Sequence, residues 1–277
     1  MINSIYKSLI GRDKVKKNIF YVPVENALIG LGGLGSYTLG EYNPYVRQVK
    51  ELMKNPDIKY RDSLIKNTRD RVVDLIENND YEKLLGENLQ PELYKYFPDE
   101  IKDNLKSEEN LIYIPYRGWI TSITKNAKKT KYIHRFSLGS DKFYPRKGDF
   151  HTLKSLYKSI KGNGYNPEEY LSINSSFIQG DLLKEKWNFK FHIASGRHRA
   201  AVLAALGYKE IPVIFYDNRK SMNKLKTARY HHILDVDNVE NWLVVKNKIY
   251  PPEFALKLFD LYYNPDEKYK ANLLGIG

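Results

Sequence analysis

The sequence predicts an α+β fold, and two stretches of the chain carry that prediction. A strand, a short loop, a helix and a second strand follow one another directly between Phe189 and Tyr216. Upstream, apolar residues recur at helical spacing from Phe150 to Lys161, which places one apolar face on a helix. With 277 residues, 42% of them hydrophobic, the chain can bury a substantial core, and we expect one main domain with an appended region.

Residues 1–125 are expected to form a mostly helical N-terminal region that carries little chemistry. Helix-like periodicity covers Val46 to Met53 and Ser63 to Leu75, and prolines interrupt the pattern between and after them. The stretch from Leu111 to Ile123 is rich in aromatic and β-branched residues, which favours a pair of strands with Gly118 at the turn. A basic stretch, Lys125 to Lys131, follows, and we place the entry to the next domain there.

Residues 126–217 are expected to form the α+β core. In chain order we expect an extended segment over Tyr132 to Leu138, a helix over Phe150 to Lys161 ended by Gly162 and Gly164, a strand over Tyr170 to Ile178, a strand over Phe189 to Ile193, a helix over Ala200 to Leu206 capped by Gly207, and a buried strand over Ile211 to Tyr216. Residues 218–277 then read as a helical C-terminal extension. It contains a basic helix over Lys220 to Tyr230 and an amphipathic docking helix from Pro251-Pro252 through Tyr263.

Charge and composition limit the function. The 45 Lys and Arg exceed the 33 Asp and Glu by 12, so the surface attracts nucleotides, nucleic acids or anionic membranes. The absence of Cys excludes disulfides, thiolate metal sites and cysteine nucleophiles. The absence of Cys also makes a reducing cytoplasm the expected compartment. The N-terminus lacks the apolar core of a signal peptide and no stretch approaches ~18 apolar residues, so we expect no insertion in a membrane.

The loop between the predicted strand and helix, Ser195-Gly196-Arg197-His198-Arg199, is the clearest candidate site. The free N–H groups of a helix N-terminus and three basic side chains would point into one small volume, which favours an anion such as a phosphate. Glycine would let the ligand approach the backbone closely. The alternative is an ordinary turn with solvated cations, in which His198 packs as a structural residue.

Two segments carry a family resemblance. ASGRHRAAVLAALGYKEIPVIF, from Ala194, resembles the signature of the ParB/sulfiredoxin superfamily, in which a basic glycine turn leads into an alanine-rich helix and a strand. FYPRKGDFHTLKSLYKSIKGNGYNP, from Phe143, is similar to the first box of ParB N-terminal domains. The two boxes occur in the family's order, and the resemblance covers about residues 130–217. It implies a ParB/sulfiredoxin-like core.

The resemblance also implies a ligand. It implies that a nucleoside di- or triphosphate (ATP, ADP or CTP) is bound with Mg²⁺ by the second-box turn, with two residues of the first box nearby. The residues concerned are Ser195, Gly196, Arg197, His198, Arg199, Arg146 and Lys147. The superfamily includes CTP-binding partition proteins, nucleases, sulfiredoxins and free-amino-acid kinases. Sulfiredoxin chemistry is excluded because Arg197 stands where its cysteine is needed. The His198-Arg199 pair resembles the turn of the free-amino-acid kinases more than the double arginine of the partition proteins.

Phosphoryl transfer needs a group that takes a proton from the attacking hydroxyl or water. Asp149, Glu168 and His198 are the catalytic candidates, and Glu169 and Asp181 lie close to the same motifs. Asp149 could instead cap the helix that follows it, and the glutamates could be solvated loop charges.

The leading hypothesis is therefore a nucleotide-dependent phosphoryl-transfer enzyme, either a small-molecule kinase acting on an unidentified acceptor or a nucleotide hydrolase. The alternative is a ParB-like DNA-binding protein or nuclease. The basic runs Lys125 to Lys131 and Arg219 to Arg229 favour this alternative, whereas the lack of a recognisable helix-turn-helix counts against it. A third reading is a module that senses a nucleotide without chemistry.

Two further motifs are weaker signals than they first look. IGLGGLGS, Ile29 to Ser36, resembles a dinucleotide turn, but no apolar helix follows it, so we expect a flexible or substrate-covering loop. His231-His232 precede two aspartates, Asp235 and Asp237, yet adjacent side chains point in different directions and rarely share one metal ion.

Overall fold

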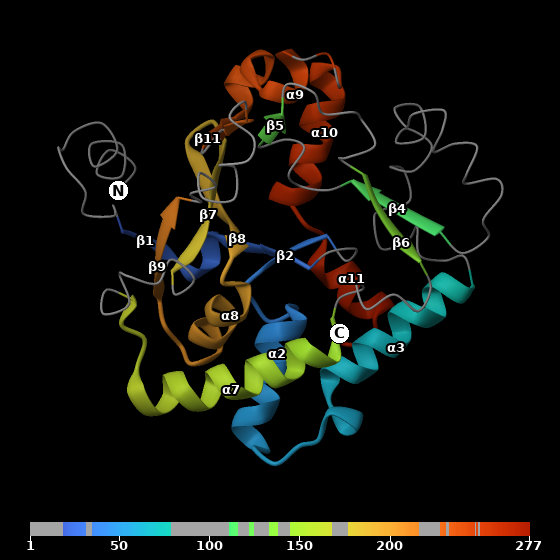
Figure 1. Ribbon diagram of the computed structural model, residues 1–277, viewed down its shortest axis with the longest axis vertical. Coiled ribbons are helices and arrows are strands. Elements are labelled where there is room, and N and C mark those ends of the chain that lie inside the picture. The colour runs from blue at the N-terminus through green and yellow to red at the C-terminus, as the bar shows by residue number, and fades with distance from the viewer. Residues whose placement is uncertain are drawn as a thin grey trace.

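The computed structural model describes residues 19–31, 35–78, 111–115, 122–124, 133–137, 145–167, 177–215, 228–230, 233–246, 248 and 250–277. Within these residues the content is mixed α and β, in agreement with the α+β class. A seven-stranded sheet lies between two groups of helices (Figure 1). No helix of this part of the chain combines the length and apolar character needed to cross a membrane.

The sheet is mixed, and its strands come from three separate parts of the sequence. They are β1 (Phe20–Pro23), β2 (Ala27–Gly30), β3 (Ser36–Thr38), β7 (Ile178–Glu185), β8 (Asn188–Ser195), β9 (Glu210–Phe215) and β11 (Ile233–Asp235). The order is β1-β9-β7-β8-β2-β3, and β11 also pairs with β7. β7 and β8 are antiparallel, whereas β9 and β11 run parallel to β7 along different parts of its length.

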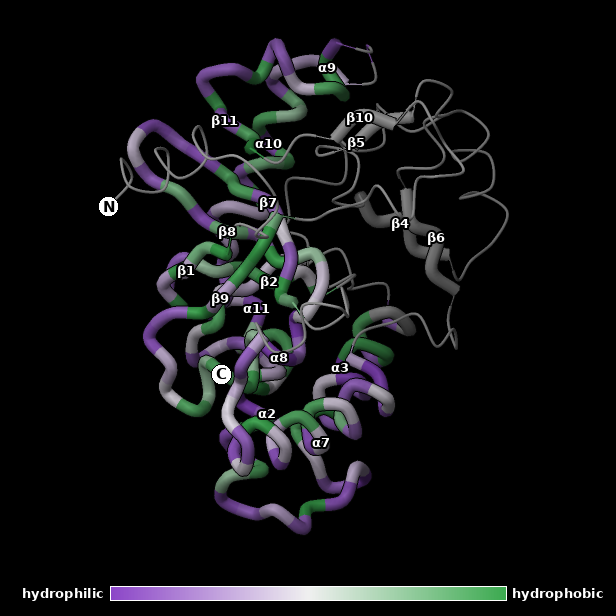
Figure 2. The backbone as a smooth tube through the Cα atoms, turned by 60° about the vertical axis from the view of Figure 1, so that its left-hand side comes forward, coloured by the Kyte–Doolittle hydropathy of each residue, from purple (hydrophilic) through white to green (hydrophobic). Residues whose placement is uncertain are grey.

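Four helices lie on one side of the sheet: α2 (Pro44–Lys54), α3 (Leu64–Glu77), α7 (Lys147–Asn163) and α8 (Arg197–Ala205), with α3 and α7 packed against α2 and α8. The other face is covered by α9 (Leu243–Lys246) and α10 (Pro252–Tyr263), while α11 (Glu267–Leu273) lies beside β3. Short 3₁₀ turns occur at Val24–Asn26 (η1), Tyr60–Asp62 (η3) and Val236–Asn241 (η8). Hydrophobic and hydrophilic residues alternate along α2, α3 and α7 in Figure 2, as expected for helices with one apolar face.

Each face of the sheet has its own core because successive strand residues point to opposite sides. Phe191 and Ile193 of β8 pack into the core beneath α2, α7 and α8. Leu28 of β2 and Leu183 of β7 face the other way, into the aromatic core under α10.

The expected helices at 46–53, 63–75, 150–161, 200–206 and 251–263 are confirmed, as are the strands at 189–193 and 211–216. The expectation for residues 1–125 was too helical, because three strands of this region belong to the central sheet. Phe20 pairs with Val213 and Ala27 with Phe191, so the described part of this region shares one sheet with the predicted core domain. These strands have only three or four residues, too few to show a period, and their partners are remote in sequence.

Two expected pairings and one expected helix also differ. β4 (Leu111–Pro115) pairs with β6 (Ile133–Ser137) and β5 (Ser122–Thr124) pairs with β10 (Ala228–Tyr230), so the expected hairpin around Gly118 is wrong. The last three residues of the expected helix over 220–230 form β10, while 216–227 lie outside the described residues. Of the expected strand at 170–178, residues 170–176 also lie outside them.

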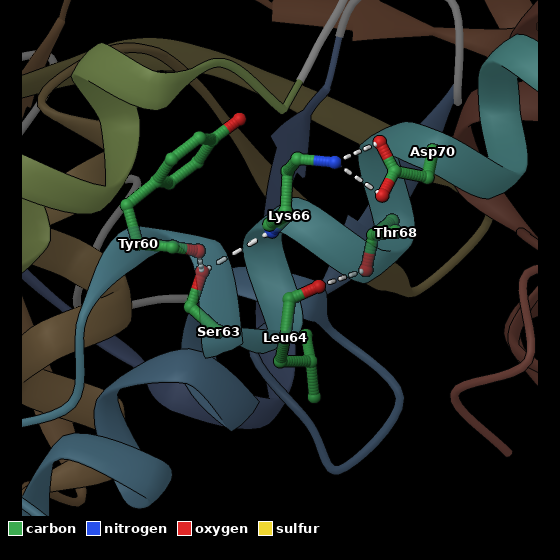
Figure 3. Close-up of polar contacts among 6 residues, drawn as sticks. All are labelled: Tyr60, Ser63, Leu64, Lys66, Thr68 and Asp70. Atoms are coloured by element: carbon green, nitrogen blue, oxygen red, sulfur yellow. Dashed lines mark hydrogen bonds and ion pairs between the residues drawn. The ribbon is translucent and has the colours of Figure 1, made fainter.

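Local side-chain bonds fix where α3 begins (Figure 3). The Ser63 hydroxyl donates to the carbonyl of Tyr60 at 2.7 Å and accepts from the backbone N–H of Lys66 at 3.2 Å. Ser63 therefore satisfies one of the N–H groups that the first turn of a helix leaves without an internal acceptor. Lys66 and Asp70 form an ion pair on the same helix, which contributes little because it is exposed.

Candidate functional site

The predicted anion loop is the turn from β8 into α8. Ser195 ends β8, Gly196 is the N-cap, and Arg197 opens the helix. Gly196 has φ +86°, and a Cβ at this position would lie 3.0 Å from the Cα of Ile178 on β7. Glycine is needed here for both reasons, because side chains rarely adopt this backbone conformation and the neighbouring strand leaves little room.

The first turn of α8 presents donors and positive charge. The N–H of Ala200 is bonded to the carbonyl of Gly196 at 3.0 Å, so the N–H groups before it have no acceptor within the helix. The N-cap is a glycine, so no cap side chain occupies them. The helix dipole adds partial positive charge to that of Arg197 and Arg199, which favours an anion at this end of α8.

Asp149 and His198 are brought together by the N-termini of two helices. Asp149 is the third residue of α7 and is only 2% exposed. Its Oδ2 accepts the backbone N–H of Arg146, the N-cap, at 2.7 Å, and its Oδ1 lies 2.8 Å from Nε2 of His198. Asp149 thus does help to cap α7, from inside the first turn rather than from the N-cap position, and it also binds the histidine.

The surroundings of Asp149 keep it ionised. Burial by itself would raise the pKa of this carboxyl, but hydrogen bonds from His198 and from the Arg146 backbone, with the nearby Tyr45 hydroxyl, outweigh it and lower the pKa below its ordinary value. An ionised carboxylate can only accept, so Nε2 of His198 must donate to it. In the neutral imidazole, Nδ1 is then the nitrogen that can accept a proton.

A third helix completes the site. The Tyr45 ring of α2 stacks on the His198 imidazole, with centroids 5.0 Å apart and planes inclined by 16°. Asn43 caps α2, and its side chain accepts the N–H of Tyr45 at 3.0 Å. Sequence reasoning missed Tyr45, because a buried aromatic in a helix with one apolar face gives no signal beyond core packing.

Arg199 has a structural partner. The hydroxyl of Tyr165, which follows α7, is hydrogen-bonded to the Arg199 side chain and to the backbone of Ile178. Burial lowers the pKa of this guanidinium, while Tyr165 opposes the shift. Arg199 therefore ties the N-terminus of α8 to the segment after α7, in addition to any ligand it contacts.

The other sequence candidates do not join this group. Lys147 is exposed, with its Nζ 5.8 Å from the centre of the Tyr60 ring. Asp181 is buried in β7, but it lies on the same side of the strand as Leu183, which faces α10 rather than α8. Glu168 and Glu169 lie outside the described residues.

Parts of the two weaker sequence motifs lie in the central sheet. The Ile29 to Ser36 stretch links β2 to the antiparallel β3, with Leu31 N–H bonded to Gly35 carbonyl at 2.9 Å. A hairpin connection cannot be a dinucleotide turn of the Rossmann type, which requires a following helix. Asp235 forms an ion pair with Lys184 at 2.5 Å, and His231 and His232 lie outside the described residues.

The described residues do not form a site that fits Mg²⁺. Nowhere in the ranges given above do three His, Asp or Glu side chains converge as metal ligands. Both carboxylate oxygens of Asp149 are already engaged, by His198 and by Arg146. We therefore assign no protein ligand to the Mg²⁺ that the family resemblance implies.

No protein-family model, no curated protein and no solved structure shows significant similarity to this chain.

Proposed function

We propose that the chain is a ParB/sulfiredoxin-like nucleotide-binding protein that transfers or hydrolyses a phosphoryl group at the N-terminus of α8. The observation that carries this proposal is the Asp149–His198 pair, held at 2.8 Å beside the first turn of that helix. An oriented histidine next to a cationic helix N-terminus combines a proton acceptor with a phosphate site, which are two of the elements that phosphoryl transfer requires.

Each residue has a separate role in this proposal. The N–H groups of the first turn and the Arg197 side chain bind phosphate oxygens, and Arg199 adds charge while it remains bonded to Tyr165. Nδ1 of His198 takes the proton of the attacking hydroxyl or water as the new O–P bond forms and the bond to the leaving phosphate breaks. Asp149 stabilises the resulting imidazolium and stays ionised, because its pKa is already lowered.

This assignment changes the role expected for Asp149. A carboxylate with a lowered pKa and two engaged oxygens is a poor proton acceptor, whereas it is well suited to orient a neighbouring imidazole. Mg²⁺ bound with the nucleotide would neutralise charge on the phosphates.

The first test is ligand-dependent stability. ATP, ADP and CTP, each with and without Mg²⁺, should raise the melting temperature because a ligand that binds only the folded state stabilises it. Arg197→Ala should weaken nucleotide binding by about 1.5–3 kcal/mol, the range for a charge-assisted hydrogen bond. Lys158→Ala, an exposed change on the outer part of α7, is the matched control and should bind as the wild type does.

Turnover and DNA binding separate the proposal from its alternatives. Loss of a terminal phosphate that is abolished by His198→Ala would support the enzyme. Nucleotide binding without turnover for any acceptor offered would favour a sensing module. Sub-micromolar, sequence-selective binding of duplex DNA at about 0.15 M salt, where non-specific affinity is weak, would instead favour the ParB-like DNA-binding reading.

A further inference from the structure

Tyr45 lies against both members of the Asp149–His198 pair. Its ring stacks on the imidazole of His198, with the centroids 5.0 Å apart and the planes inclined by 16°. Its hydroxyl is near the carboxylate of Asp149 and helps to lower the pKa of that group. Tyr45 is fully buried, whereas the side chain of His198 is 19% exposed. Solvent, and therefore a ligand, can reach the histidine but not the tyrosine.

The backbone of Tyr45 is fixed by the cap of its helix. Asn43 is the N-cap of α2, and its Oδ1 accepts the backbone N–H groups of Tyr45 and Val46 at 3.0 and 3.3 Å. The Nδ2 group of Asn43 donates to the carbonyl of Thr38, in β3, at 2.6 Å. Asn43 thus ties the first turn of α2 to the central sheet. The ring of Tyr45 is therefore held through its backbone by Asn43 and along its sides by the core.

The imidazole of His198 needs such support because one hydrogen bond does not fix the plane of a ring. The contact between Nε2 and Oδ1 of Asp149 anchors one edge. Rotation about the Cβ–Cγ bond of a histidine has broad energy minima, so the rotamer alone leaves the tilt of the ring loosely defined. A proton acceptor must come within about 2.6–3.2 Å of the atom that carries the proton. The tilt of the imidazole consequently decides whether Nδ1 can serve as the acceptor.

We propose that Tyr45 is the positioning residue of the Asp149–His198 pair: its ring fixes the plane of the imidazole, and its hydroxyl supports the carboxylate. Because Tyr45 is buried, it acts through His198 and does not contact the substrate. The proposal rests on the proposed function for the role of Nδ1, but the arrangement of the three side chains can be tested without turnover. Loss of the ring should affect the chemical step more than nucleotide binding, since the phosphate contacts are assigned to Arg197 and the first turn of α8.

Kinetics of Tyr45 variants test the role of the ring. Tyr45→Leu removes the stack and should lower kcat about tenfold to a hundredfold, while the KM for the nucleotide changes by less than about threefold. Tyr45→Phe keeps the ring and should recover most of that kcat. Tyr157→Leu is the matched control, because Tyr157 is a buried tyrosine of the same core that lies about 12 Å further along α7 than Asp149. Its kcat should stay near that of the wild type.

NMR tests the arrangement whether or not the protein turns over a nucleotide. At a pH where the imidazole is neutral, the ¹⁵N signals of His198 in the wild type should show one form with the proton on Nε2. Tyr45→Leu should give shifted or broadened signals, because the ring can then tilt away from Asp149. The pKa of Asp149, followed through its carboxyl carbon, should be higher in Tyr45→Phe than in the wild type, because the contribution of the Tyr45 hydroxyl is lost.

Three results would overturn the proposal. The first is a folded Tyr45→Leu protein that keeps the kcat, or the ¹⁵N signals, of the wild type. The second is an equal loss of kcat in Tyr157→Leu, since a general loosening of the core would then explain both losses. The third is an unchanged pKa of Asp149 in Tyr45→Phe, which can be measured even if Tyr45→Leu does not fold. Absence of turnover in the wild type would contradict the proposed function instead, and the NMR results would still decide the role of Tyr45.

Discussion

Oδ1 of Asp149 lies 2.8 Å from Nε2 of His198, although the two residues are 49 positions apart in the sequence. Each residue is in the first turn of its helix, Asp149 in α7 and His198 in α8. The contact therefore joins two helix N-termini. It also makes a stability test of the pair possible, because one carboxylate serves both a helix cap and the histidine.

Asp149→Asn should destabilise the protein by about 1.5–3 kcal/mol at pH 7, the range for buried hydrogen bonds to a charged group. The amide keeps the shape and one acceptor oxygen but loses the charge that holds the imidazole. Urea unfolding measures the difference. Asp74→Asn is the control, since Asp74 is exposed and lies 4.0 Å from Arg71, so its loss should change stability by less than about 0.5 kcal/mol.

The same pair predicts a dependence on acid. The pKa of Asp149 is lower in the folded protein than in the unfolded chain, so its ionisation stabilises the fold at pH values above the ordinary Asp pKa, and the contribution is lost as pH falls through the folded value. The stability difference between wild type and Asp149→Asn should accordingly be constant near neutrality and shrink below about pH 4. Urea titrations at a series of pH values would contradict this if the difference grew in acid.

Gly196→Ala should destabilise by at least about 1–2 kcal/mol, the usual cost of the left-handed conformation for a residue with a side chain. The close approach to Ile178 adds to that cost. Gly162→Ala in α7 is the matched control, because a Cβ there meets nothing within 4 Å. Alanine favours helix over glycine, so this control should be neutral or more stable by up to about 1 kcal/mol. Equal effects of the two changes would remove the special role of Gly196.

The turn at Gly196 was predictable because its signals are local. A strand, a glycine, three basic residues and an alanine-rich helix follow one another within one short segment. The structure confirms the strand, the glycine turn and the helix, but Arg197, His198 and Arg199 form the first turn of α8 rather than the loop before it. β1 was not predictable, because its four residues become a strand only through pairing with β9, which is about 190 residues further along the chain.

In the candidate site, too, some features follow from local sequence and others depend on contacts between remote residues. Residue type alone suggested Asp149 and His198, but their contact depends on how α7 and α8 pack against each other. Tyr45 and Tyr165 carried no signal of their own, since a tyrosine that packs in a core and one that supports a functional residue look alike in a single sequence.

Lys270 is a further residue whose position only the structure reveals. It is 4% exposed, and its Nζ lies 5.3 Å from the centre of the Tyr37 ring and 3.4 Å from the Ser36 carbonyl. Burial lowers its pKa to about 8, while Glu267 and Asp266 oppose the shift. The carboxylate of Glu267, one turn earlier on α11, accepts a hydrogen bond from the Thr38 hydroxyl at 2.9 Å.

Lys270→Met should be more stable than the wild type at neutral pH, and the advantage should fade in alkali. Because the pKa is about 8 in the folded protein and 10.5 ordinarily, the unfolded chain binds more protons between these values, and wild-type stability rises with pH there. By pH 10.5 the free energy of unfolding of the wild type should have risen by up to about 3 kcal/mol relative to that of Lys270→Met. Lys268→Met, exposed on the same helix, controls for general charge effects and should show no such trend. Urea unfolding of the three proteins from pH 7 to 10.5 measures this change in the free energy of unfolding. If that free energy varied with pH in the same way for wild type and Lys270→Met, Lys270 would keep its proton throughout.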